Sequence, residues 1–137
     1  MRGPRPATAI GMISPLAAAA LLASCSAETQ EAHYDDLEEA RAEGAVDQGW
    51  IPEWVPEEAR NIQEMHDLDT NAQLLAFTVG SRTMPEPCEE LAVDPEGPSL
   101  SADWFPRRPG SLTKQCGEFH AVLNDGRIHA WTNGGAG

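Results

Sequence analysis

The sequence predicts a small single domain of the α+β class, with two antiparallel hairpins, one or two short helices and one disulfide bond. Three observations predict it. Apolar and polar residues alternate in two segments, 61–79 and 117–133, as is typical of half-buried strands. Residues 34–44 carry the start and end signals of a helix. Cys88 and Cys116 remain as a pair once the cysteine near the N-terminus is set aside.

The first 24 residues are expected to be a signal peptide. Arg2 and Arg5 give a positively charged start, and the apolar run of 14 residues that follows is too short to span a bilayer. The run ends in "LASC", which resembles the bacterial lipobox. The resemblance implies that Cys25 becomes a lipidated N-terminus, with acyl chains such as palmitate holding it in the membrane. If the envelope is Gram-negative, Ser26 in the position after the lipidated cysteine favours transport of the lipoprotein to the periplasmic face of the outer membrane. The alternative is an ordinary signal peptide with an incidental cysteine.

The chain from Cys25 onward is expected to have three parts. Residues 25–33 are the lipidated N-terminus and a short tether, 34–132 the α+β domain, and 133–137 a frayed tail. All 22 acidic residues follow Cys25, whereas two of the nine basic residues precede it, so the mature chain would carry a formal charge of −15. This charge excludes a basic surface for binding nucleic acid. It also disfavours adhesion of the domain to anionic membrane lipids, so the acyl chains on Cys25 would have to anchor the protein.

The predicted helix covers residues 34–44. Asp35 is placed to cap it, with Glu38 three residues later, and Gly44 suits its end. The helix carries few apolar residues, so it must pack on the rest of the domain to be stable.

The segment 50–79 is expected to form the first hairpin. Two prolines near its start impose extended or turn backbone, with a short helical turn after the second. Residues 61–66 and 72–79 then alternate as strands, and in the second of these Leu75 and Phe77 share one face.

Cys88 and Cys116 are predicted to form a disulfide, because an even pair in an oxidising compartment is normally bonded. The bond would close a loop of about 29 residues and contribute about 3.6 kcal/mol by the chain-entropy argument. A free thiol pair or half of a metal site is the alternative. Residues 88–93 are expected to form a short helix, and residues 94–111, rich in Pro, Gly, Ser and Asp, a long surface loop.

Asp125 and Gly126 predict the type I′ turn of the second hairpin. Pairing across this turn sets Leu123 opposite Ile128. The expected core is rich in aromatic residues and contains Trp50, Trp54, Phe77, Phe119, Ile128 and Trp131.

The stretch "HDLDTN" begins like a calcium-binding EF-hand loop, with Asp67, Asp69 and Asn71 at alternate positions. The Gly and Glu that such a loop needs are replaced by Ala72 and Thr78, and the flanking segments are predicted strands. Asp and Asn side chains also bond the backbone two residues ahead, so a tight turn between strands is the favoured interpretation. A cation site at these three residues is the alternative.

A longer pattern resembles a known group of proteins. It runs over residues 49–79, from "GWIP" through "VPEEARNI" to "HDLDTN" and an aliphatic–aromatic strand, and covers 31 of the 113 residues from Cys25 onward. The pattern is similar to a largely uncharacterised family of small bacterial lipoproteins with a W-x-P … D-x-D-T-N motif, some of them described as having a YbbD-type head domain. The resemblance implies an envelope-facing domain and brings no catalytic or binding residue with it.

The four histidines do not predict a metal centre. His120 and His129 would be diagonal neighbours on one face of the second hairpin, whereas His33 lies in the tether and His66 beside the turn. Zinc needs three or four ligands, so a third would have to come from elsewhere in the fold. No cofactor is expected.

The loop before the second hairpin holds a candidate interaction patch, made of Trp104, Phe105, Arg107 and Arg108. In so acidic a chain, a local cluster of basic and aromatic residues has the composition of an interface anchor. The favoured interpretation is that the two aromatic rings fold back over the core while the arginines neutralise nearby carboxylates, because a small domain needs its large apolar groups inside.

The expected function is that of a membrane-anchored envelope lipoprotein whose domain binds another envelope protein. The serines lie in predicted loops without a G-x-S-x-G nucleophile pattern, so the domain is predicted to be non-enzymatic. The alternative is a small-ligand or calcium binder acting through Asp67, Asp69 and Asn71. A small hydrolase would need a carboxylate or histidine that only the fold could bring into place.

Overall fold

A computed structural model describes residues 3–4, 11 and 28–134 of the chain. Cys25 and most of the predicted signal peptide lie outside the described residues. Within them, no helix is long and apolar enough to cross a membrane. The elements in chain order are β1 (Thr29–Asp36), α1 (Leu37–Ala42), β2 (Arg60–Asp67), β3 (Gln73–Thr78), β4 (Glu89–Glu90), β5 (Lys114–Cys116), β6 (Phe119–Asn124) and β7 (Arg127–Thr132).

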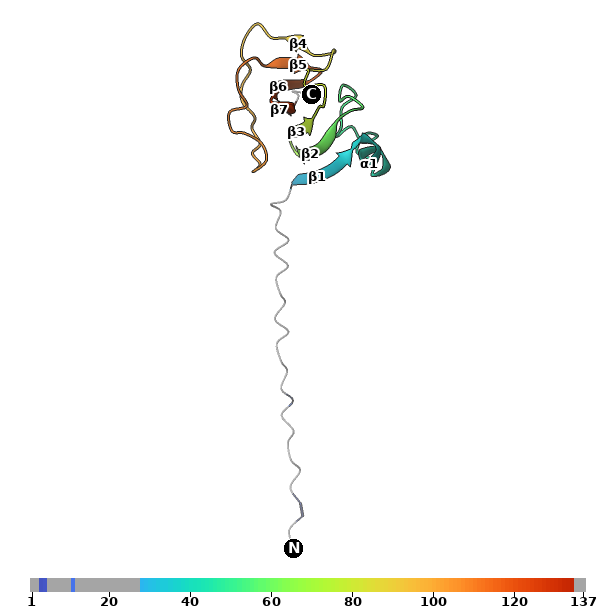
Figure 1. Cartoon of the computed structure of the whole chain (residues 1–137). Helices are drawn as coiled ribbons and strands as arrows, with labels where there is room; N and C mark the ends of the chain where they lie inside the picture. Colours follow the sequence, from blue (N-terminus) through green and yellow to red (C-terminus); the bar gives the residue numbers. More distant parts are fainter. Residues whose placement is uncertain (1–2, 5–10, 12–27, 135–137) are drawn as a thin grey trace.

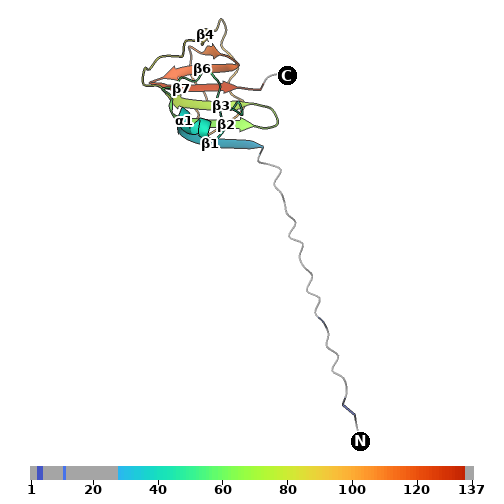
Figure 2. The same cartoon turned by 90° about the vertical axis from the view of Figure 1, so that its right-hand side faces the viewer.

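The strands form one antiparallel sheet in the order β1-β2-β3-β7-β6-β5-β4 (Figure 1). It consists of two meanders, β1-β2-β3 and β4-β5-β6-β7, which meet where β3 pairs with β7 (Figure 2). After β3 the chain crosses to the far edge of the sheet, begins again at β4 and returns strand by strand to the centre.

The predicted α+β class is wrong. The two segments predicted to be hairpins are the pairs β2–β3 and β6–β7, but Phe77 pairs with Ile128, so all four strands are neighbours in a seven-stranded sheet. In the described part of the chain, α1 is the only α-helix and has six residues. An isolated hairpin is marginally stable in water. Joining β3 to β7 pairs the backbone N–H and C=O groups of two strand edges and makes the apolar surfaces of both meanders continuous.

β1 includes residues that were predicted to belong to the tether and to the helix. Residues 29–33 pair with β2, and Tyr34 lies opposite Ile62. Tyr34 is buried there, because alternate side chains of the strand point toward the apolar face of the sheet.

α1 is shorter than the predicted helix and begins later. The Asp36 carboxylate accepts a hydrogen bond of 2.9 Å from the N–H of Glu39. The Glu39 carboxylate in turn accepts one from the N–H of Asp35. The cap and its glutamate are each one residue later than predicted, and the return bond comes from the residue before the cap. Gly44 has a φ of 83°, the left-handed conformation that fits the predicted helix end.

The register of the β6–β7 hairpin is confirmed. Leu123 pairs with Ile128, and the pairing continues along both strands. Asp125 has a φ of 52° and Gly126 a φ of 81°, and two positive values are what a type I′ turn requires.

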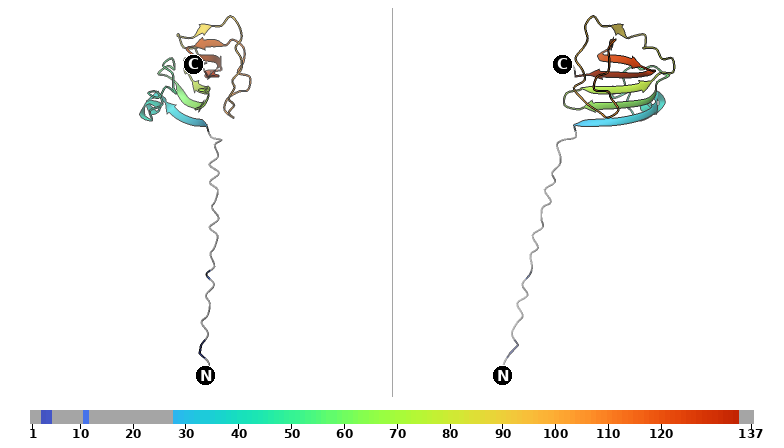
Figure 3. Two further views of the ribbon diagram at one scale, coloured as in Figure 1. Left: turned by 180° about the vertical axis from the view of Figure 1, so that it is seen from behind. Right: turned by 60° about the vertical axis from the view of Figure 1, so that its left-hand side comes forward.

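Each face of the sheet buries its own apolar cluster. α1 and the chain after it lie over one face, and the long loop before β5 lies along the other, as Figure 1 and Figure 3 show from opposite sides. Because side chains alternate along a strand, Leu74 and Leu75 enter different clusters. The cluster beside α1 includes Ile62, Leu75, Phe77, Phe119 and Ile128, and the cluster under the long loop contains Met65, Leu74, Phe105, Val122 and Trp131.

The predicted aromatic core is therefore divided. Phe77 and Phe119 are buried in the cluster beside α1, whereas Trp131 is buried on the opposite face. Trp50 and Trp54 are half-buried and cover the sheet from the loop that precedes β2.

The predicted disulfide between Cys88 and Cys116 is confirmed, and it joins the start of β4 to the end of β5. The predicted helix over residues 88–93 is wrong. The bond sets the two cysteines across from each other, and Glu89 and Glu90 continue the pairing as strand β4. Residues 94–111 contain no helix or strand, as predicted for a loop.

Candidate functional site

The turn between β2 and β3 contains the residues considered as cation ligands. The Asp67 carboxylate accepts hydrogen bonds from the N–H groups of Thr70, at 3.0 Å, and Asp69, at 2.8 Å, and these bonds hold the pKa of Asp67 below its usual value. Asn71 is left-handed, with a φ of 60°. The favoured prediction of a tight turn is confirmed, since the first carboxylate is engaged by the backbone. Across the described residues, no group of three or more His, Cys, Asp or Glu side chains could hold a metal ion.

The candidate patch in the long loop divides into a buried part and an exposed part. Phe105 is buried, with its ring centroid 5.3 Å from that of His129 and 6.4 Å from that of Trp131. Trp104 packs edge-on against Phe105, and its Nε1 donates a hydrogen bond of 3.0 Å to Glu31. The aromatic pair folds back over the sheet, as the favoured interpretation predicts.

The prediction that the two arginines of the patch neutralise nearby carboxylates is wrong. Arg107 and Arg108 are exposed, and within the described residues neither forms an ion pair. They therefore do not neutralise neighbouring carboxylates and remain as a small basic surface on an acidic domain.

Replacing Trp104 with alanine is expected to lower the free energy of unfolding by about 1–2 kcal/mol, because a half-buried ring and its bond to Glu31 are lost. Urea unfolding measures this. Arg107→Gln is the control, and as an exposed substitution it should change stability by less than about 0.5 kcal/mol. Equal losses in the two variants would contradict the division of the patch.

His120 and His129 lie together on the face covered by the long loop. His120 pairs with Trp131 and His129 with Val122, so the two histidines are diagonal neighbours, as predicted. Nδ1 of each ring is buried and has no hydrogen-bond partner among the described residues. Burial lowers the pKa of both histidines, for His129 to about 4, with the positive charge of Arg127 adding to the effect. Both rings are therefore uncharged at neutral pH.

The shift of His129 predicts that acid destabilises the domain. Its pKa falls from 6.5 to about 4 on folding, so between these values the unfolded chain binds more protons and stability drops as the pH is lowered. At full burial the shift would correspond to about 3 kcal/mol, and partial exposure reduces the expected loss to about 1–2 kcal/mol. Urea unfolding across this window should show a flatter pH profile for His129→Leu than for the wild type. An identical profile would contradict the assignment.

A buried polar cluster, which was not predicted from the sequence, lies beneath Trp50. Glu64 is 1% exposed and His66 5% exposed on one face of β2. His66 Nδ1 lies 2.8 Å and 3.0 Å from the two carboxylate oxygens of Glu64. Gln73 Nε2 donates to Glu64 at 3.1 Å and to the backbone carbonyl of Trp50 at 3.0 Å. The Trp50 ring stacks on His66, with centroids 3.5 Å apart.

This cluster ties the loop that carries Trp50 to the sheet. Burial raises the pKa of Glu64, and the bonds from His66 and Gln73 oppose the rise. A histidine oriented by a carboxylate is half of a nucleophilic dyad, but His66 Nε2 is buried and has no partner among the described residues. The sequence did contain a signal: Glu64 and His66 occupy alternate positions after Ile62, on the inward face of a strand.

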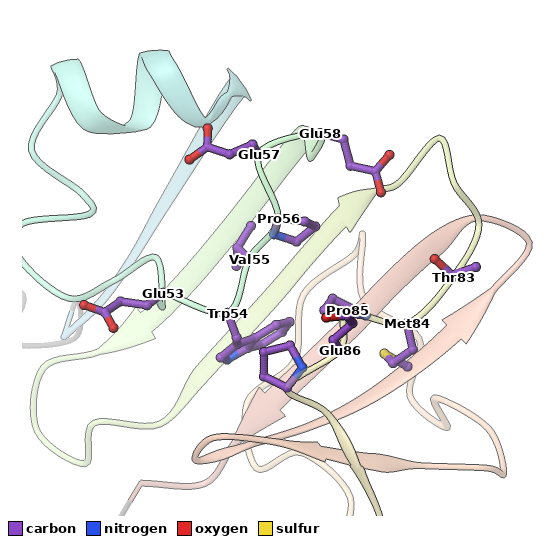
Figure 4. Close-up of a pocket in the computed structure, with 11 residues that line it drawn as sticks. Glu53, Trp54, Val55, Pro56, Glu57, Glu58, Thr83, Met84, Pro85 and Glu86 are labelled. Atoms are coloured by element: carbon purple, nitrogen blue, oxygen red, sulfur yellow. The ribbon is translucent and has the colours of Figure 1, made fainter.

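A groove lies between residues 53–58, which precede β2, and residues 83–87, which precede β4 (Figure 4). Its volume is about 470 Å³. Both loops contribute apolar side chains and glutamates to its lining. It is lined by Trp54, Val55, Pro56, Met84, Pro85 and Pro87, by Thr83, and by the glutamates Glu53, Glu57, Glu58 and Glu86.

Both walls of the groove are held by the core. The Trp54 ring contacts Phe77 and Phe119, with centroids 5.8 Å away in each case. Val55 beside it is buried in the same cluster. On the other wall, the disulfide at Cys88 fastens the end of the loop to β5. The groove is therefore a preformed surface.

The glutamates of the groove differ in their partners. Glu57 pairs with Arg41 at the exposed end, and the bond from this arginine lowers the pKa of Glu57. Glu58 accepts two hydrogen bonds from Ser81, one from the backbone N–H and one from the hydroxyl group. In the described part of the chain, Glu53 and Glu86 form no ion pair. Since no lysine or arginine lines the groove, its potential is negative.

The groove was missed because its walls are far apart in the sequence. Each wall has the same local composition, with glutamates beside prolines in "WVPEE" and in "MPEPCEE". This repeated composition was the available signal, but nothing in it shows that the two stretches face each other.

Comparison with protein families identifies the first meander. Residues 28–78, which cover β1, α1, β2 and β3, match the family model described as the YbbD head domain. This part of the chain is therefore YbbD-head-like, as the resemblance implies, and it carries one wall of the groove. Searches of the curated proteins and of the solved structures found no match to the chain.

Proposed function

We propose that the protein is a membrane-anchored lipoprotein of the bacterial envelope, and that its domain binds another envelope protein without catalysing a reaction. The observation that carries the proposal is the groove, in which half-buried Trp54 lies beside Glu53 on one wall and Glu86 is on the other. A large aromatic side chain in a rigid concave surface is typical of an interface anchor. The leader sequence ending at Cys25 and the YbbD-head-like segment support the envelope as its compartment.

The anchor would hold the domain close to the membrane. β1 begins at Thr29, so residues 26–28 alone separate it from Cys25, a span of at most about 14 Å. Thr29 pairs with Asp67, so the β2–β3 turn lies at the end of the sheet nearest the anchor. The acidic side chains of Asp67 and Asp69 would oppose close contact with anionic lipid.

In-cell crosslinking of the full-length protein, followed by mass spectrometry of the attached proteins, tests this function. The expected result is one dominant envelope protein, recovered less well when Cys25→Ser prevents lipidation. Circular dichroism of the variant checks that it still folds. If the lipidated wild type recovers no enriched protein, the binding function is wrong. If the wild type is found without lipid, the anchor is wrong.

A further inference from the structure

We propose that the groove binds an extended, positively charged segment of the partner protein, with an arginine or lysine side chain lying against Trp54. The inference rests on the proposed function and names the chemistry of the partner. It follows from the charge of the groove, from its aromatic floor and from the proline rings of its walls.

The charge of the groove selects a basic ligand. Four glutamates line it, and no lysine, arginine or histidine does. Arg41 neutralises Glu57, which leaves Glu53, Glu58 and Glu86 to determine the local charge. Carboxylates on both loops attract a cation into the space between them and repel an acidic segment by the same effect.

Trp54 supplies the apolar part of the site. It lies on the wall formed by residues 53–58, with Met84 and Pro85 on the facing wall (Figure 4), and its ring is backed by Phe77 and Phe119. Arginine and lysine combine an apolar stem with a cationic head, and the face of an indole ring attracts such a head. A basic side chain on Trp54 would therefore place its stem on the ring and its charge toward the glutamates.

The walls favour an extended segment. Pro56, Pro85 and Pro87 present rigid apolar rings and no backbone N–H groups, so a bound chain cannot pair with these positions as a β-strand. Extended segments that pack on such surfaces through their side chains are a common mode of peptide recognition. The volume of about 470 Å³ is that of a small-ligand site, which fits a few side chains of such a segment. Because the core and the disulfide hold both walls, binding would order little of the domain.

Fluorescence anisotropy with a labelled peptide of alternating arginine and proline, added to the full-length protein in mild detergent, tests the inference. Saturable binding that weakens several-fold between about 50 and about 300 mM salt is expected. Glu53→Gln with Glu86→Gln should weaken binding about tenfold, as should Trp54→Ala, because each removes one part of the site. The matched control is Asp94→Asn with Glu96→Gln, which removes the same charge from the exposed loop on the opposite face and should leave affinity within about twofold.

Three outcomes would overturn the inference. Equal weakening in the groove variant and the control would mean that attraction is set by net charge alone. Absence of binding by the wild type would remove the groove as a basic-peptide site. Self-association in the ultracentrifuge, lost in the variant of Glu53 and Glu86, would make a second copy of the chain the occupant, through its exposed Arg107 and Arg108.

A photocrosslinking residue placed in cells separates failure of this inference from failure of the proposed function. At Thr83, on the groove, it should attach to a basic segment of the partner, and at Asp94 it should not. Attachment from Asp94 alone would retain the binding function and overturn the groove as its site. Attachment from neither position would also overturn the groove, and recovery of a partner in the in-cell crosslinking of the wild type would then decide the binding function.

Discussion

Replacing His66 with leucine is expected to lower the free energy of unfolding at neutral pH by about 3–5 kcal/mol. The change leaves the Glu64 carboxylate 1% exposed, with a single hydrogen bond of 3.1 Å from Gln73 in place of its full set of partners. A buried carboxylate in this position must either stay charged in a medium of low dielectric constant or take up a proton, and both are unfavourable. The stacking of Trp50 on the histidine ring is lost as well.

The size of this loss should depend on pH in a direction set by Glu64. Burial raises the pKa of Glu64 above 4.5, and without the opposing effect of His66 it rises further. The folded state then keeps a proton that the unfolded chain has released, so its stability falls as the pH rises through the raised pKa. Urea unfolding should therefore show a larger loss for His66→Leu near about pH 8 than near about pH 5.

The variant that carries both Glu64→Leu and His66→Leu is the control. It leaves no buried charge, so it should recover much of the stability lost in the single variant. If the double variant is as unstable as His66→Leu, the loss reflects the missing contact with Trp50, and the account based on charge is wrong.

Removing the disulfide through Cys88→Ala with Cys116→Ala is expected to lower the free energy of unfolding by about 3–4 kcal/mol. The two cysteines are separated by 28 positions, which sets the size of the loop that the bond closes in the unfolded chain. In the folded chain β4 has two residues, paired with β5 through Glu89 and Glu90. Little else holds this edge strand to the sheet. Urea unfolding measures the global loss, and wild type treated with reductant should behave like the variant.

A local measurement distinguishes the role of this bond in the groove from its effect on the whole domain. Amide hydrogen exchange should accelerate in residues 83–90 more than in the β6–β7 hairpin, since the loop loses its covalent attachment to β5. The affinity of the variant without the disulfide for the basic peptide should also fall, because one wall of the groove is no longer attached to β5. Unchanged exchange in 83–90 would mean that packing on the core, and not the disulfide, fixes that wall.

Features that depend on neighbouring residues were determined by the sequence itself. Asp125-Gly126 determined the turn and register of β6–β7, because two adjacent residues with positive φ allow one tight connection between twisted strands. The Asp67 side chain determined the β2–β3 turn by accepting hydrogen bonds from the backbone just ahead of it. The pairing of Cys88 with Cys116 followed from the number of cysteines and from the oxidising compartment that the sequence predicts.

Features that join distant segments were decided by the tertiary structure alone. Alternation identifies β3 and β7 as strands but not as partners, so the sequence was compatible with two separate hairpins and with one sheet. β1 reads as a polar tether until it is paired with β2, because an edge strand exposed on one side needs few apolar residues. The groove likewise exists only where the chain before β2 meets the loop before β4. In each case the deciding interaction is a contact between two segments, and the residues of neither segment show which other segment it will contact. Burial of apolar side chains on both faces of the sheet selects that contact.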